Sequence, residues 1–215
     1  MHFTTGHRHA YLAIIPFLGV ALPGAEAYSQ IITADDGVGT YVETTGDRID
    51  ISGGQVSGDR TNLFHSFEQF DITAEQTANF VTTENIQNVV GRVDSHRAST
   101  INGTLQVSGS DANLYLMNPA GVLLGPDAQL NLSGGFTATT ATGIGFAEGQ
   151  ELSATGTENY SQLNGTPETF HFDDVQPGAV VNLAELSVDE HKAISLVGGT
   201  VVNAGKLSAP EGTVT

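Results

Sequence analysis

The sequence is poor in several residue types, and each shortage narrows the range of functions. Its 215 residues include no cysteine and no tryptophan, and only 7 lysine and arginine residues stand against 24 aspartate and glutamate residues. The formal charge of −17 argues against a nucleic-acid partner, because binding to phosphates needs cationic side chains that displace counterions. The same charge argues against binding to anionic membrane surfaces.

The sequence also lacks an apolar run long enough to span a bilayer as a helix. The apolar run nearest the N-terminus, residues 10–22, is too short to span a bilayer and follows a weakly basic start. Ala25 and Ala27 place small side chains at the two positions that a signal peptidase reads. We therefore expect residues 1–27 to be a signal peptide that is cleaved after Ala27. A short buried helix is the alternative, and the prolines in and after the run fit it poorly.

Export usually permits disulfide bonds, yet this sequence has no cysteine to form them. One interpretation is that the chain must stay unfolded after it crosses the inner membrane, because an early disulfide would close a loop and obstruct threading through a narrow pore. The other is that a large core needs no cross-links, and 39% apolar residues allow such a core. Composition alone leaves both interpretations open.

Helix signals are scarce as well, since no long stretch places apolar residues at helical spacing. Short alternating segments are common instead. In residues 101–107, Ile101, Leu105 and Val107 share one face, and residues 127–132 alternate in the same way. Turn residues separate such segments, so the sequence predicts an all-β fold made of short, half-buried strands.

Internal repetition makes the fold prediction more specific. Residues 178–190 align without a gap with residues 199–211, an offset of about 21 residues. The same spacing separates Ile101 from the start of residues 122–125. A period of about 21 residues with two or three strands per unit predicts a parallel β-helix, in which successive coils stack about 4.8 Å apart.

Other repeat architectures fit the pattern less well. A leucine-rich repeat needs a leucine framework that is missing here, and a propeller repeat is about twice as long. In a β-helix, Asn182 and Asn203 would stack at a corner. The last residues read as a strand without a polar cap, so we expect further coils after residue 215. We assign residues 28–95 to an N-terminal β cap with the first coils, and residues 96–215 to the later coils.

A tight turn interrupts the apolar middle of the chain. Asn118, Pro119, Ala120 and Gly121 fit a type I turn, with asparagine first, proline second and glycine fourth. The simplest interpretation is an ordinary corner of a coil. Whether the turn also has a function cannot be decided from its local sequence.

Residues 61–72 hold three phenylalanines, Phe64, Phe67 and Phe70, at intervals of three. This spacing is compatible with a short helix or with an irregular cap. Packing of the N-terminal core is the simplest role for these rings, and an aromatic ligand site is the alternative.

The sequence contains few residues in patterns typical of catalytic sites. The sequence has no nucleophile elbow and no phosphate-binding loop. Four histidines lack the spacing of metal ligands, and they are His65, His96, His171 and His191. We therefore expect no bound metal. Because catalytic motifs are also missing, we expect no cofactor and no enzymatic activity. One charged cluster could line a carbohydrate groove, although it lacks further carboxylates; it comprises Arg92, Asp94, His96 and Arg97.

Taken together, the motifs of residues 92–144 resemble the N-terminal two-partner secretion domain of the filamentous haemagglutinin family, also called the haemagglutination activity domain. They include an Arg-Val strand, a Ser-x-Ile-x-Gly coil, an Asn-Leu strand, the Asn-Pro turn and a Gly-Gly-Phe strand. An earlier segment is similar to the family's Asn/Phe/His/Phe pattern and could be read by a transporter or serve as a cap; its residues are Asn62, Phe64, His65, Phe67 and Phe70.

The resemblance implies a right-handed parallel β-helix with an N-terminal cap and export by the Sec route into the periplasm of a Gram-negative-type envelope. It also implies recognition there by an outer-membrane TpsB-type β-barrel transporter with periplasmic POTRA domains. The chain would be the secretion-recognition and folding-nucleation domain of a large secreted or surface-exposed adhesin. The family's Asn-Pro-Asn-Gly motif falls on Asn118 to Gly121, with Ala120 in place of the usual asparagine. The turn would therefore act through its shape.

Two other functions remain compatible with the sequence. The domain could itself be an adhesin that binds glycans or host-cell surfaces, in which case a purified fragment would bind them. It could also be a β-helical polysaccharide lyase or hydrolase. That activity needs several carboxylates or basic residues converging on one face.

Overall fold

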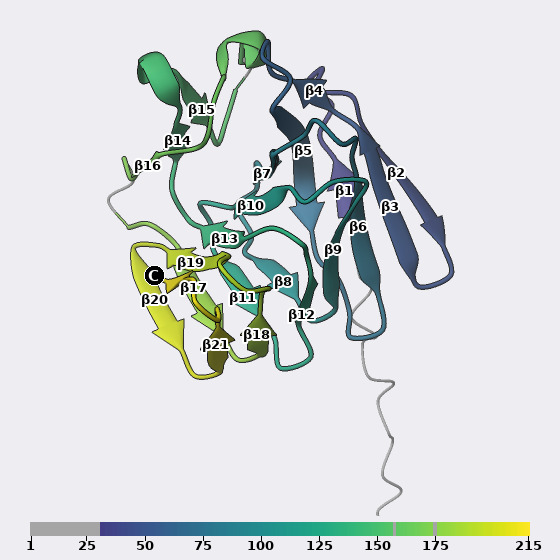
Figure 1. Cartoon of the computed structure of the whole chain (residues 1–215), viewed down its shortest axis with the longest axis vertical. Coiled ribbons are helices and arrows are strands. Elements are labelled where there is room, and N and C mark those ends of the chain that lie inside the picture. Colours follow the sequence, from purple (N-terminus) through teal and green to yellow (C-terminus); the bar gives the residue numbers. More distant parts are fainter. Residues whose placement is uncertain (1–30, 157, 174–175) are drawn as a thin grey trace, which may run out of the picture.

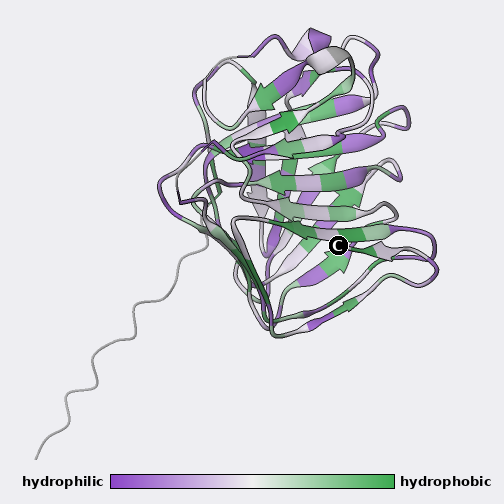
Figure 2. Cartoon of the chain, turned by 90° about the vertical axis from the view of Figure 1, so that its left-hand side faces the viewer, coloured by the Kyte–Doolittle hydropathy of each residue, from purple (hydrophilic) through white to green (hydrophobic). Residues whose placement is uncertain are grey.

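The computed structural model describes residues 31–156, 158–173 and 176–215. These residues form a solenoid of stacked β coils, and Figure 2 shows hydrophobic positions repeated from one coil to the next. Among them, no helix is long and apolar enough to cross a membrane. Because strands of successive coils pair in parallel along the body of the solenoid, the prediction of an all-β parallel β-helix is confirmed.

The strands of the coils lie on three faces of the solenoid (Figure 1). Sheet A contains β1 (Ile31–Thr33), β4 (Gln55–Val56), β5 (Asn62–Phe70), β7 (Asn88–Val93), β10 (Asn113–Met117), β13 (Phe136–Thr139), β19 (Ala193–Val197) and β22 (Thr213–Val214). Sheet B contains β2 (Thr40–Thr45), β3 (Arg48–Gly53), β6 (Thr77–Val81), β9 (Thr104–Ser108) and β12 (Gln129–Asn131), and β18 (Glu185–Ser187) and β21 (Lys206–Ser208) follow as a separate pair. Sheet C contains β8 (Ser99–Ile101), β11 (Val122–Leu124), β17 (Ala179–Asn182) and β20 (Thr200–Asn203).

Columns of like residues build the core. In sheet A, Val89, Leu114, Phe136 and Ile194 occupy equivalent positions on neighbouring strands, and all four are buried. In sheet B, apolar and polar residues alternate along β9 as Leu105 and Val107 turn inward, and this alternation fixes the register of the coils.

Coil length is not constant along the chain. Stacked asparagines in the first coils are 26 and 25 residues apart, whereas Asn182 and Asn203 are 21 apart. The 21-residue period predicted from the C-terminal repeat therefore holds there, and earlier coils have longer corners. The predicted 21-residue spacing between Ile101 and Val122 was wrong as a coil length, because Ile101 pairs with Leu124.

Asparagine ladders join the coils at two corners. Asn88 donates to the side-chain oxygen of Asn62 at 2.8 Å and accepts from Asn113 at 3.0 Å. At the other corner Asn182 donates to Asn203 at 2.8 Å, which confirms the predicted stack. Asn62, Asn88 and Asn182 are buried, and each finds a hydrogen-bond partner on the next coil, so the ladders hold the coils in register.

We expect Asn88→Ala to lower the free energy of unfolding by about 2 kcal/mol, because it leaves the buried side-chain oxygen of Asn62 and the half-buried amide of Asn113 without their partner. Urea unfolding of the purified chain measures this loss. Asn131→Ala is the matched control, since Asn131 is exposed and its replacement should change stability by less than about 0.5 kcal/mol. Equal losses in the two variants would contradict a stabilising ladder.

Antiparallel strands cover the N-terminal end of the solenoid. β2 pairs with β3, and β1 and β4 pair with the outer edge of β5. The phenylalanines of residues 61–72 therefore lie on a strand and not on a helix. The pairing register of β1 with β5 shifts between Gln69 and Phe67, a β-bulge that brings Phe67 and Phe70 into the same core. This irregularity explains their spacing of three.

An insertion, residues 140–178, leaves the solenoid after β13 and rejoins it before β17. It forms a small antiparallel sheet of β14 (Gly143–Gly145), β15 (Glu151–Ser153) and β16 (Thr169–His171), with short 3-10 turns at Ala147–Gly149 and Tyr160–Gln162 (Figure 1). The insertion packs on the outward face of sheet A and buries a second apolar cluster. From the solenoid, that cluster takes Val38, Phe64, Val90 and Met117. Sheet A is thus covered on both faces.

Candidate functional site

The Asn-Pro-Ala-Gly turn is held almost entirely by its first residue. Asn118 is fully buried, and its side-chain N–H groups donate to the Arg97 carbonyl and the Ser99 hydroxyl, each at 3.0 Å. Its side-chain oxygen accepts from the Ala120 N–H, and its carbonyl accepts from the Gly121 N–H, both at 3.0 Å. Every polar group of the Asn118 side chain is used inside the fold, so none is left to contact a partner.

The turn also sits against the point where the insertion returns. The Gly178 N–H donates to the Pro119 carbonyl at 3.0 Å, and a Cβ atom on Gly178 would lie 2.5 Å from that oxygen. Gly121 has a φ of 135°, and a Cβ there would lie 3.0 Å from that of Ala98. Gly178 is therefore required by the close approach of the turn backbone, and Gly121 by its positive φ.

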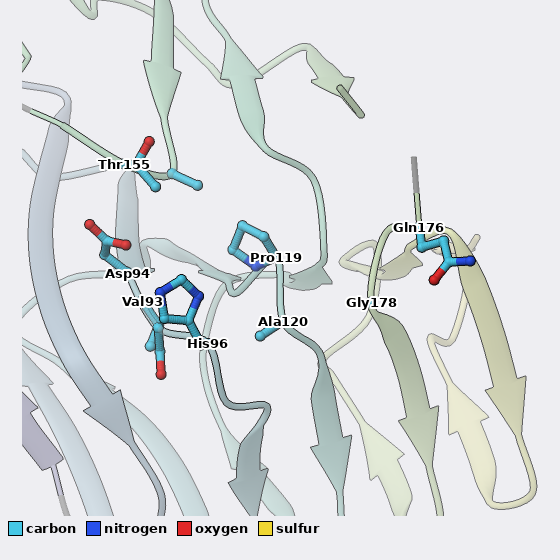
Figure 3. Close-up of a pocket in the computed structure, with 10 residues that line it drawn as sticks. Val93, Asp94, His96, Pro119, Ala120, Thr155, Gln176 and Gly178 are labelled. Atoms are coloured by element: carbon cyan, nitrogen blue, oxygen red, sulfur yellow. The ribbon is translucent and has the colours of Figure 1, made fainter. Parts of the chain in front are cut away.

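Beside the turn lies a cleft of about 410 Å³, which we call the turn cleft. Figure 3 shows Pro119 and Ala120 between the segment of Asp94 and His96 and the returning strand at Gly178. The turn cleft is lined by Val93, Asp94, Ser95, His96, Pro119, Ala120, Ala154, Thr155, Gln176 and Gly178. Pro119 and Ala120 are half-buried, so they are the part of the motif that faces the cleft.

An acidic hollow adjoins the turn cleft and shares Asp94 and His96 with it. Asp35, Asp36 and Glu68 also line this hollow. Burial raises the pKa of Asp36, but hydrogen bonds from the Ser66 hydroxyl, the Val38 N–H and Arg92 outweigh this effect and lower the pKa below its usual value. Asp36 therefore carries its negative charge at neutral pH.

Arg92 immediately precedes Val93 and Asp94, which line the turn cleft. Its side chain is 2% exposed and donates to the Ser153 carbonyl at 3.1 Å, the Gly156 carbonyl at 3.0 Å and the Asp36 carboxylate at 2.5 Å. Two further hydrogen bonds reach the Ser66 hydroxyl. The hypothesis that Arg92 lines a carbohydrate groove is wrong, because its guanidinium is buried and ties the insertion to the solenoid. Asp94 and His96, from the same predicted cluster, do line the cleft.

A second attachment holds the far end of the insertion. Asn62 donates to the carbonyls of Leu163 and Gly165 at 2.8 and 2.7 Å. Burial raises the pKa of Asp59, but hydrogen bonds from the Ser57 hydroxyl and from the Gly165 and Thr61 N–H groups outweigh it and lower the pKa to about 2. The turn before β5 and the insertion therefore close on each other.

The predicted Asn/Phe/His/Phe segment is brought into the interior. Asn62, Phe64, His65, Phe67 and Phe70 are all buried, so this segment offers no surface in the folded domain. Any contact between these side chains and a partner would have to precede folding. The other predicted site, with Ala25 and Ala27, lies outside the described residues.

No cluster suited to a metal ion occurs among the described histidine, aspartate and glutamate residues. Sequence reasoning missed Thr155 and Gln176, which line the turn cleft from the insertion. Their place depends on where the insertion folds back, and no local sequence motif signals this.

Comparison with known proteins assigns the class of protein to which this solenoid belongs. The TPS secretion domain family matches residues 30–215, and the chain belongs to that family. It therefore has a secretion-related role in two-partner secretion, and its family is a non-enzymatic kind of protein.

A solved relative agrees with this assignment. The chain is similar to the crystal structure of the HMW1 secretion domain from Haemophilus influenzae, with 25% identity and a TM-score of 0.60. The alignment covers 84% of this chain and 42% of that chain, so the match spans less than half of the solved protein. No curated protein matches the sequence.

Proposed function

We propose that the domain is recognised in the periplasm, after Sec export, by a TpsB-type outer-membrane transporter through its POTRA domains, and that it nucleates folding of a larger surface protein. Membership of the TPS secretion domain family supports a transporter partner. The absence of cysteine fits a chain that passes a pore unfolded.

Recognition by the transporter is supported by the different positions of the residues within the turn. Asn118 is used up inside the fold, while Pro119 and Ala120 face the turn cleft. We propose that the transporter reads the shape of this turn and cleft. Ala120, which stands where the family usually has asparagine, then contributes space and backbone rather than an amide contact.

We expect Ala120→Arg to reduce transporter-dependent release into the medium about ten-fold, because a long side chain would fill the turn cleft and a central contact is worth about 1–2 kcal/mol. Release is measured with and without the transporter, and urea unfolding checks the stability of the purified chain. Ala120→Asn should retain release, since asparagine is the residue expected at that position.

Ala74→Arg is the matched control, because Ala74 is exposed in the turn after β5 and does not line the cleft. It should leave release unchanged. Normal release of the Ala120→Arg chain, with the transporter still required, would show that the cleft is not read. Equal release without the transporter would overturn the proposed function itself.

A further inference from the structure

His65 is a buried titratable residue that the proposed function does not use. It is 1% exposed and lies in β5, with its ring centroid 6.3 Å from that of Phe67 and 5.6 Å from that of Phe80. Neither ring nitrogen has a hydrogen-bond partner among the described residues. A buried polar side chain without partners is rare in native proteins and calls for an explanation.

The described neighbours of the ring are uncharged, and burial is the only cause of the shift in its pKa. Gly54, in the turn between β3 and β4, lies so close that a Cβ atom there would be 3.0 Å from Cε1 of His65. Gly91 is its partner on β7, and the two phenylalanine rings fill the interior side. The nearest cation along β7, Arg92, binds Ser66 and Asp36 on the opposite face of sheet A.

We propose that His65 makes closure of the first coil, which contains β5 and β6, depend on the pH of the medium. The folded domain is then more stable at neutral pH than in acid. The residue joins three parts of that coil: the β3–β4 turn, the strand β5 and the adjoining β6. A charge placed among these groups would have no counter-charge and no acceptor. Closure of the coil is therefore favoured when the ring is neutral and opposed when it is protonated.

The direction of the effect follows from burial. Desolvation lowers the pKa of His65 from 6.5 to about 4. Between these values the unfolded chain binds a proton that the folded chain rejects, so stability rises with pH through this window and is complete above the unfolded value. From pH 7.5 to pH 5, this single group should raise the unfolding equilibrium constant about 30-fold.

The acidic residues with shifted pKa values act in a different window. Asp36 and Asp59 have pKa values below the usual 3.8, so their stabilising contributions are present above that value and are lost only in stronger acid. A loss of stability between pH 6.5 and 4 that depends on residue 65 can thus be separated from ordinary acid denaturation.

The test is urea unfolding of the purified chain at pH 7.5 and pH 5, which involves no transporter and so is independent of the proposed function. We expect His65→Phe to remove the 30-fold change, because phenylalanine fills the site with a ring that cannot be protonated. His191→Asn is the matched control, since His191 is exposed, and it should retain the full change. A His65→Phe chain with the same pH dependence as the original would overturn the proposal.

A second measurement does not require the variant to fold. Imidazole resonances of the unmodified chain can be followed by NMR as the pH is lowered. We expect the His65 ring to stay neutral in the folded chain until the pH approaches 4. Protonation of His65 in the folded chain near pH 6.5 would also overturn the proposal.

Discussion

Replacement of Arg92 by methionine is expected to lower the free energy of unfolding by about 3–5 kcal/mol, more than any other single change that we propose. Methionine can fill much of the space, but it leaves the Asp36 carboxylate without its cation and the carbonyls of Ser153 and Gly156 without a donor. The loss is large because the guanidinium is 2% exposed and all of its partners lose a charged donor at once. Urea unfolding measures the loss.

Arg97→Met provides the control for charge removal. The Arg97 side chain is 67% exposed, and its contact with Asp71 is 3.2 Å, so the pair should contribute less than about 1 kcal/mol. Hydrogen exchange adds a local measurement, since the Arg92→Met chain should lose protection in the insertion before the solenoid opens. If Arg92→Met and Arg97→Met cost the same, the guanidinium does not fasten the insertion.

Asn118→Ala should be the next most damaging change, at about 3 kcal/mol. It removes two hydrogen bonds to the preceding coil and the one that orders Ala120 N–H, in a position without access to water. The expected phenotype is a loss of stability as well as a loss of release. Denaturant unfolding and release assays on the same chain separate this from an effect on recognition.

Asn118→Asp sharpens the comparison. An ionised aspartate keeps the side-chain oxygen that accepts from the Ala120 N–H. It has no N–H group to donate to the Arg97 carbonyl, so the free energy of unfolding should fall nearly as far as with alanine. The Ala120→Arg chain should show the opposite pattern, with stability retained and release lost. A stable Asn118→Ala chain that is poorly released would mean that Asn118 itself contacts the transporter.

The extent to which the sequence predicted this fold depends on how local each signal is. The two C-terminal coils repeat the same environment, and Val180 pairs with Val201 as their alignment requires. Earlier corners vary in length without changing which residues face inward, so a period taken from the last coils did not transfer to Ile101 and Leu124. Strand periodicity predicts coils, but only the corners set their spacing.

The fold of the insertion could not be predicted from the sequence, for a different reason. Its strands are three residues long, and the paired residues Ile144 and Leu152 are buried in one cluster with side chains of the solenoid. They are explained only by the outward face of sheet A. Arg92 did carry a signal, since it interrupts the apolar strand Asn88–Val93, where a charged side chain needs a buried partner. The turn cleft depends on the insertion and so could not be foreseen either.

The position of the insertion bears on the order in which the coils can close. Val122 of β11 pairs with Val180, which lies beyond the whole insertion, whereas Val180 pairs with Val201 a single coil later. Contacts between distant residues form more slowly than local ones. A chain that folds from its N-terminal end would therefore complete the coil of β10, β11 and β12 and then wait, with the outer edge of β11 unpaired, until β17 is available. Elongation of the solenoid would proceed in two stages, separated by a delay that the length of the insertion sets.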